Sequence, residues 1–147
     1  GTCQDSAYHK LFLQHLREEL GHDELLAARS HKHRSHDSIL HATSMWFCNQ
    51  MIILDNLEKA ALVHLVLEVS GAYYHALAKK KLGTEAPEYY EAHTQVDDIH
   101  AQMGADLLHG HPAEVYRRLH NVIDKGWSML DAMTQRVVQI VERRNKL

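Results

Sequence analysis

The chain has 147 residues, 45% of them hydrophobic, and a formal net charge of −3, which together indicate one ordinary globular domain spanning residues 1–147. The 16 basic residues form no stripe, so nucleic acid and anionic membranes are poor candidates as partners. No apolar run is long enough to span a bilayer, and the two cysteines form no disulfide framework, so we expect a cytoplasmic protein.

The first half of the chain shows a 3.6-residue periodicity of apolar side chains, without the alternation typical of strands. A first helix is expected over residues 5–29 and a second over 37–54, with a polar, histidine-rich connector between them. Asp55 and Asn56 form a break and an N-cap before a third helix, which is expected over residues 57–82.

The second half continues in the same way. Gly83 ends the third helix, and Pro87 suits the first turn of a fourth helix that reaches Leu108. The segment 110–112 separates it from a last helix, expected over residues 113–143. The short connections favour antiparallel packing of neighbouring helices, so the sequence predicts an all-α bundle of about five helices.

Histidine and carboxylate side chains interrupt the apolar stripes of three of these helices. His93, Asp97 and His100 follow one another at i, i+4 and i+7, which places them on one face of the fourth helix. Glu19 and His22 are one turn apart on the predicted inward stripe of the first helix, which also includes Phe12, Leu16 and Leu26. Glu68 lies on the inward stripe of the third helix. The predicted inward stripe of the last helix, in contrast, contains no ionisable residue, so we interpret that helix as structural. This stripe consists of Val115, Leu119, Val122, Gly126, Leu130, Met133, Val137 and Ile140.

Buried carboxylates require cations or strong hydrogen bonds, so inward-facing carboxylates on three helices predict a shared metal site. Helical bundles build dinuclear iron or manganese sites from such Glu and Glu-x-x-His elements. Six side chains without a thiolate favour two ions of Fe(II), with Mn(II) as the alternative, over one tetrahedral zinc. The predicted metal ligands are Glu19, His22, Glu68, His93, Asp97 and His100. For Glu68, a buried pair with His64 is the competing interpretation.

The order Glu-x-x-His, Glu, His-x-x-x-Asp-x-x-His resembles the haem-oxygenase-like di-iron oxidases and oxygenases. The segment Glu18-Glu19-Leu20-Gly21-His22-Asp23 and the pair Tyr90 and His93 also resemble that family, and the likeness extends from about Leu13 to Leu108. The resemblance implies a haem-oxygenase-like bundle, the same six ligands, and activation of O2 at two iron ions. The substrate it implies is a small organic acid, amine or amino-acid-like molecule.

Members of that family are generally longer, with helices before the one that carries Glu-x-x-His. The chain is therefore expected to be a fragment or a reduced version of the domain. A truncated bundle exposes apolar surface, which favours a homodimer.

Three other functions remain open at this point. Glu-x-x-His also occurs in ferritin-like storage or metal-sensing proteins. His22-Asp23 with Asp97 downstream is compatible with a metal-dependent phosphohydrolase of the HD type. A TenA-like domain that binds a ligand without a metal would share the broader fold.

Overall fold

The computed structural model describes residues 5–22, 24, 36–82 and 87–146, and within them the fold is all-α, as predicted. No strand occurs in those segments. The α-helices and one π-helical segment, η1, are α1 (Ser6–Glu19), α3 (Ser38–Ile53), α4 (Asn56–Leu62), η1 (Val63–Glu68), α5 (Val69–Leu82), α6 (Pro87–Leu107) and α7 (Ala113–Arg144).

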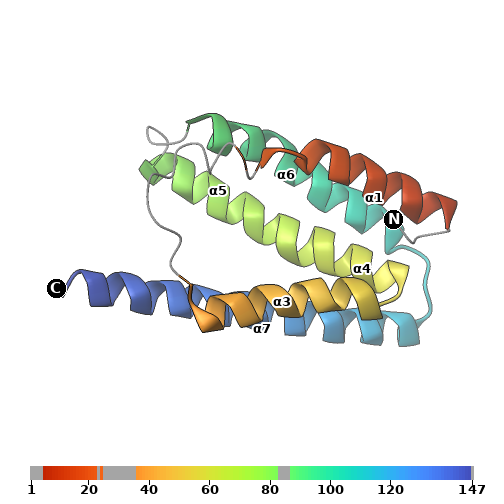
Figure 1. Cartoon of the computed structure of the whole chain (residues 1–147). Helices are drawn as coiled ribbons and strands as arrows, with labels where there is room; N and C mark the ends of the chain where they lie inside the picture. Colours follow the sequence, from red (N-terminus) through yellow and green to blue (C-terminus); the bar gives the residue numbers. More distant parts are fainter. Residues whose placement is uncertain (1–4, 23, 25–35, 83–86, 147) are drawn as a thin grey trace.

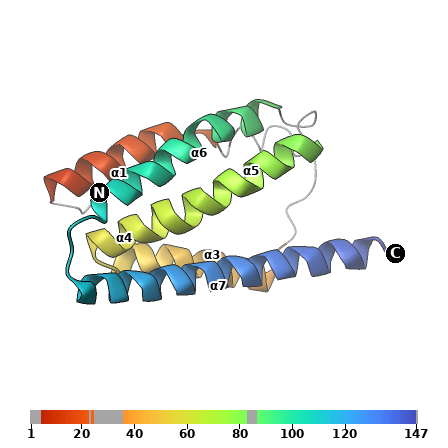
Figure 2. The same cartoon turned by 180° about the vertical axis from the view of Figure 1, so that it is seen from behind.

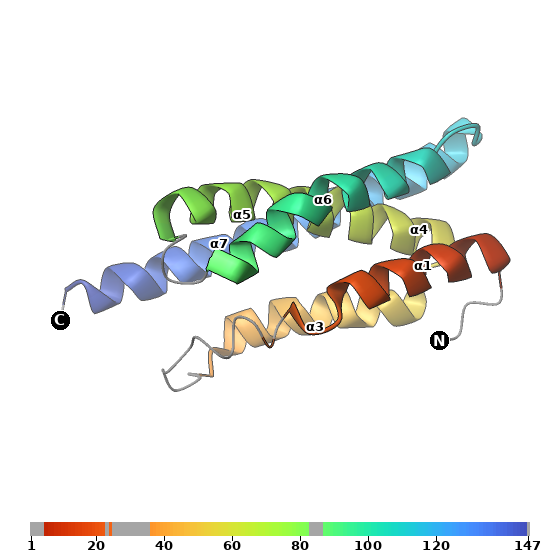
Figure 3. The same cartoon turned by 90° about the horizontal axis from the view of Figure 1, so that it is seen from above.

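A central rod made of α4, η1 and α5 runs through the bundle without interruption. Figure 1 shows α1 and α6 along one side of this rod and α3 and α7 along the other, and the reverse view in Figure 2 agrees. Helix α6 packs on η1 and α5, whereas α7 packs on α4 and α3. Seen from above in Figure 3, α1 lies over α3, next to α6. This arrangement places α1, η1 and α6 around one common space.

The starts of α3 and α4 are stabilised by side-chain caps, of which the sequence predicts the one at residues 55–56. Asp55 accepts a hydrogen bond from the Glu58 amide while the Glu58 side chain accepts one from the Asp55 amide, which is a complete capping box. Asp37 caps α3 by accepting from the amides of Ile39 and Leu40. The break predicted at residues 55–56 is therefore confirmed, and α6 begins at Pro87 as expected.

Two apolar clusters between the central rod and α7 form the core. One contains Leu57, Ala61 and Leu119, and the other contains Leu62, Val66 and Val122. The predicted inward stripe of the last helix is correct at Leu119, Val122 and Gly126, which are buried. It is wrong at Val137, which is 46% exposed, because the C-terminal part of α7 extends beyond the start of α3 (Figure 1).

The first helix is shorter than predicted. It ends at Glu19, because the following turn contains Gly21 with a φ of 93°, a conformation that favours glycine. Residues 23 and 25–29 of the predicted helix lie outside the described segments. The predicted inward stripe is also wrong at Leu16, which is 61% exposed, whereas the adjacent His15 is turned toward the bundle.

An ion pair ties the start of α3 to α7, and it predicts a pH-dependent contribution to stability. Arg136 donates through Nε and Nη2 to Asp37 Oδ2, at 3.0 and 2.8 Å. This guanidinium is the main cause that lowers the pKa of Asp37 from 3.8 to about 2. A depressed carboxyl pKa stabilises the folded state above the unfolded pKa, and that contribution disappears as the pH falls through the folded pKa.

We therefore expect Asp37→Asn, which preserves the N-cap, to be less stable than the wild type at pH 6. The difference between the two proteins should shrink as the pH falls below about 4 and be lost only below about pH 2, the folded pKa. Urea unfolding at several pH values measures this difference. A difference in unfolding free energy that stays constant down to the lowest measurable pH would contradict the role of the ion pair.

Exposed apolar side chains occur on α3 and α7, including Ile39, Ile52, Ile53, Val138 and Val141. They are compatible with the homodimer that the sequence predicts, which stays a prediction. Within the described segments, every helix is either too short or too polar to cross a bilayer.

Candidate metal centre

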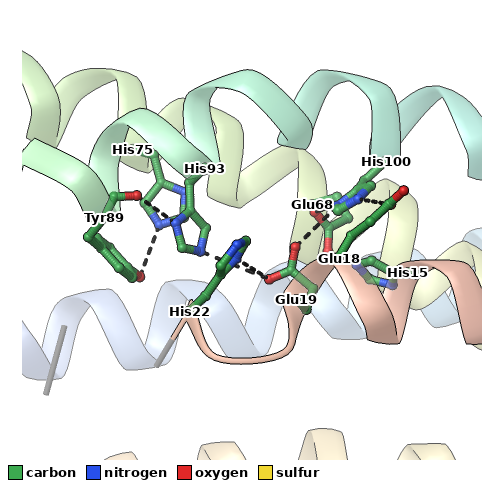
Figure 4. Close-up of polar contacts among 9 residues, drawn as sticks. All are labelled: His15, Glu18, Glu19, His22, Glu68, His75, Tyr89, His93 and His100. Carbon is green, nitrogen blue, oxygen red and sulfur yellow. Dashed lines mark hydrogen bonds and ion pairs between the residues drawn. The ribbon is translucent and has the colours of Figure 1, made fainter. Parts of the chain in front are cut away.

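Carboxylate and imidazole side chains from α1, η1 and α6 converge in the space between these helices (Figure 4). Five of the six predicted ligands meet there, namely Glu19, His22, Glu68, His93 and His100. Asp97 lies in α6 between the last two, but its side chain is outside the described part of the structure. His15, which is not among the predicted ligands, joins the cluster as well.

The first ligand group consists of His15, Glu19, Glu68 and His100, which can offer ligand atoms within 4.8 Å of one another. His15 Nε2 lies 2.8 Å from Glu68 Oε1. His100 Nδ1 lies 3.2 Å from Glu68 Oε2 and 3.4 Å from Glu19 Oε1. The His100 side chain is only 1% exposed, so this group is deeply placed.

The second group consists of Glu19, His22 and His93. Glu19 Oε2 is 3.1 Å from His22 Nδ1 and 4.0 Å from His93 Nε2. The two oxygens of Glu19 therefore face different groups, Oε1 the first and Oε2 the second. Glu19 is the side chain that both groups share, as a carboxylate bridging two ions would be.

Several buried polar atoms in this region have no hydrogen bond within the described residues. They are Glu19 Oε1, His15 Nε2 and both ring nitrogens of His64. His15 Nε2 and Glu68 Oε1 are close, yet their contact lacks hydrogen-bond geometry. Buried groups of this kind cost free energy unless they have a partner. Oxygen and nitrogen donors that point at a common space fit divalent metal ions, so the cluster passes this test for a metal centre.

The competing interpretation of Glu68 as the partner of His64 is not supported. Glu68 contacts His15 and His100, whereas His64 has no hydrogen bond among the described residues. Burial would raise the pKa of Glu68, but the neighbouring His15 and His100 outweigh it and lower this pKa. Burial is the main cause that lowers the pKa of His64 to about 4, so its ring is neutral at pH 7.

Two hydrogen bonds outside the cluster orient its histidines. Glu18 Oε2 accepts from His100 Nε2 at 2.8 Å, which leaves Nδ1 facing Glu19 and Glu68. The backbone carbonyl of Tyr89 accepts from His93 Nδ1 at 2.8 Å, which leaves Nε2 facing Glu19. Metal-binding histidines commonly donate their second ring nitrogen to a carboxylate or carbonyl in this way. Both rings therefore have one nitrogen directed at carboxylates of the cluster, as the rings of metal-binding histidines would.

The Glu18 contact gives a testable prediction. Glu18→Ala should weaken divalent metal binding by about 10- to 100-fold, because His100 loses the acceptor that orients its ring. Competition with a chromogenic chelator measures the affinity, and Glu24→Ala, at an exposed position just after α1, serves as the matched control. Equal affinities of the Glu18 variant and the control would show that Glu18 does not act through His100.

The spacing of residues in the first helix contains a signal that could have identified His15 as a member of the cluster. His15, Glu19 and His22 have the same spacing, His-x-x-x-acid-x-x-His, as His93, Asp97 and His100. Placing Leu16 on the inward stripe conceals this match, because His15 and Leu16 cannot both face the bundle fully.

The described residues thus define an all-α protein with a cluster of His and Glu side chains that could hold metal ions. The chain is 33% identical over 135 residues to an uncharacterized protein of Rickettsia prowazekii (strain Madrid E). The match covers 90% of this chain and 66% of that relative, so the chain spans just under two thirds of the relative's length. No family model matches the chain, and no solved structure matches it.

Proposed function

We propose that this protein is a di-iron oxidase or oxygenase that activates O2 and acts on a small organic acid, amine or amino-acid-like substrate. The observation that carries the proposal is the pair of ligand groups that share Glu19. Imidazole and carboxylate donors without thiolate suit Fe(II) and, as the alternative, Mn(II). The resemblance of the Glu-x-x-His and His-x-x-x-Asp-x-x-His segments to haem-oxygenase-like enzymes supports the same chemistry.

Ferrous ions bound here would supply the electrons that reduce O2. The residues of the chain would bind the ions, orient the histidine ligands and shield the centre from water. Glu19 and Glu68 offset the positive charge of the ions, and Glu18 and the Tyr89 carbonyl orient His100 and His93. The low exposure of His100 limits the access of bulk water to the deeper group. Water exclusion protects a reactive centre from side reactions.

The substrate class has weaker support, from the outer surface of α1. An open groove of about 430 Å³ is lined there by Lys10, Leu13, Gln14, Arg17 and Glu18. Its two cations could attract an anionic substrate, and Glu18 connects this groove to His100. This favours an organic acid or an amino acid over a simple amine.

The decisive experiment is anaerobic reconstitution with Fe(II), followed by metal analysis and oxygen-electrode measurements. We expect two ions per chain and O2 consumption that increases when small carboxylic acids or amino acids are added. Protein loaded with Zn(II), which has no redox chemistry, is the control. Failure of the reduced protein to bind iron would overturn the proposal.

The alternative is a TenA-like or ferritin-like helical protein that binds a ligand or a metal without oxygenase activity. A ferritin-like function would give iron-dependent O2 consumption that no organic substrate changes. A TenA-like function would give ligand binding that is independent of metal. The oxygen-electrode measurements separate the oxidase from the ferritin-like function, and calorimetric titration of the metal-free protein with small organic ligands identifies the TenA-like one.

A further inference from the structure

We propose that His15 is a metal ligand and that it forms, with His100, the imidazole pair of the deeper metal position. This inference rests on the metal centre in the proposed function. The predicted ligand set does not include His15. Without it, the deeper position (Glu19, Glu68 and His100) has one imidazole, whereas the outer position (Glu19, His22 and His93) has two. With His15 included, each position has two imidazoles, one from α1 or the turn after it and one from α6.

The geometry of the two helices supports this pairing. The ring centroids of His15 and His100 are 4.4 Å apart, and those of His22 and His93 are 4.5 Å apart. The first histidine of each His-x-x-x-acid-x-x-His segment thus lies next to the last histidine of the other segment: His15 next to His100, and His93 next to His22. This is the relation expected of two antiparallel segments with the same spacing, and it brings Glu19 between the two pairs (Figure 4).

His15 has the position and the chemistry of a ligand. Its side chain is 13% exposed, and its Nε2 atom is 2.8 Å from Glu68 Oε1 without hydrogen-bond geometry. Glu68 in turn contacts His100. The side chains of His15, His100 and Glu68 therefore surround the deeper metal position on three sides. Glu19 Oε1, which is buried and has no hydrogen bond to any described residue, is the fourth donor directed at that space.

His64 gives a second, independent observation on the same side of the cluster. Its ring is 0% exposed, its centroid is 5.1 Å from that of His15, and neither nitrogen has a hydrogen bond within the described residues. A buried neutral imidazole needs one donor and one acceptor as partners. The unused hydrogen-bonding capacity beside His15 indicates that this end of the cluster is built to receive a polar ligand. The π-helical turn that carries both His64 and Glu68 is a feature often found at functional sites.

An ion pair without metal is the competing role for His15. Burial would lower the pKa of His15, but the adjacent Glu68, with Glu19 and Glu18, raises it. The two roles predict opposite effects of removing the ring. A ligand that is lost weakens metal binding, whereas an imidazolium that is lost no longer competes with the metal for Glu68, so that binding is unchanged or tighter.

The test is an anaerobic titration with Co(II), followed by its visible absorption and by competition with a chelator. The wild type should bind two ions per chain. His15→Ala and His15→Gln should lose one of them, with an affinity about 100-fold or more weaker at that position, since even outer partners of a ligand are worth 10- to 100-fold. Millimolar imidazole should restore the second ion in His15→Ala but not in His15→Gln, where the side chain fills the space. His9→Ala, at an exposed histidine on the same helix, should bind as the wild type does.

Two ions bound by both His15 variants with unchanged or tighter affinity would overturn the role of His15 and leave the proposed function standing. Loss of one ion in these variants, together with no O2 consumption by the iron-loaded wild type, would overturn only the oxidase. A wild type that binds no metal would overturn both. Circular dichroism of each variant confirms that it is folded before the titration.

Discussion

Glu19→Gln is expected to remove both ions from the proposed centre, because Glu19 is the one side chain that both ligand groups share. An amide oxygen keeps the shape but loses the negative charge that offsets two divalent cations. Metal analysis after anaerobic loading and desalting should therefore find less than one ion per chain. In His22→Gln, by comparison, the first group keeps all of its members and should retain one ion.

The same variant should also lose the stabilisation that metal gives to the wild type. A metal present at about 100 times its dissociation constant stabilises the folded state by about 2.7 kcal/mol for one site. In a domain of this size that corresponds to an increase in Tm of about 5 to 10 °C. We expect this increase in the wild type and in Glu142→Gln, at an exposed position on α7, but not in Glu19→Gln. Full metal binding by Glu19→Gln would show that the two groups do not form one centre.

Gly126→Leu is expected to destabilise the fold more than any exposed substitution on α7. A Cβ atom at this position would lie 2.7 Å from Leu62 Cδ1 and 3.0 Å from Val66 Cγ1, closer than van der Waals contact allows. Leu62 and Val66 are both 0% exposed, and the β-branched Val66 has little freedom to move. Overpacking of this kind costs about 1–3 kcal/mol and occasionally more, and the large leucine side chain should fall at the upper end.

The measurement is urea or thermal unfolding of the metal-free protein, in which Tm should fall by about 6 to 12 °C. Ala132→Leu adds the same side chain to an exposed position of the same helix and should change stability by less than about 0.5 kcal/mol. Leucine has a higher helix propensity than glycine, so any destabilisation of the first variant must come from packing. A loss below about 1 kcal/mol would contradict the close approach of α7 to the central rod.

The sequence alone predicts those features that depend on local chemistry. The N-cap at Asp55 depends on neighbouring residues only, and proline at position 87 suits a helix start because its ring presets the backbone. The spacing of His93 and His100 places them on one face of any α-helix, and both join the cluster. The haem-oxygenase-like nature of the bundle, in contrast, stays a prediction.

Only the tertiary structure decided which side of α1 faces the bundle and where that helix ends. His15 and Leu16 are adjacent, and hydrophobicity favours Leu16 as the inward residue, yet Leu16 is exposed and His15 contacts Glu68. The charge of Glu68 comes from a helix more than fifty positions away, so no local pattern contains it. Helix periodicity determines which side chains share a face, but the rotation of the helix depends on what its neighbours offer that face. Here the neighbours offer carboxylates and imidazoles, and the imidazole of His15 is turned toward them.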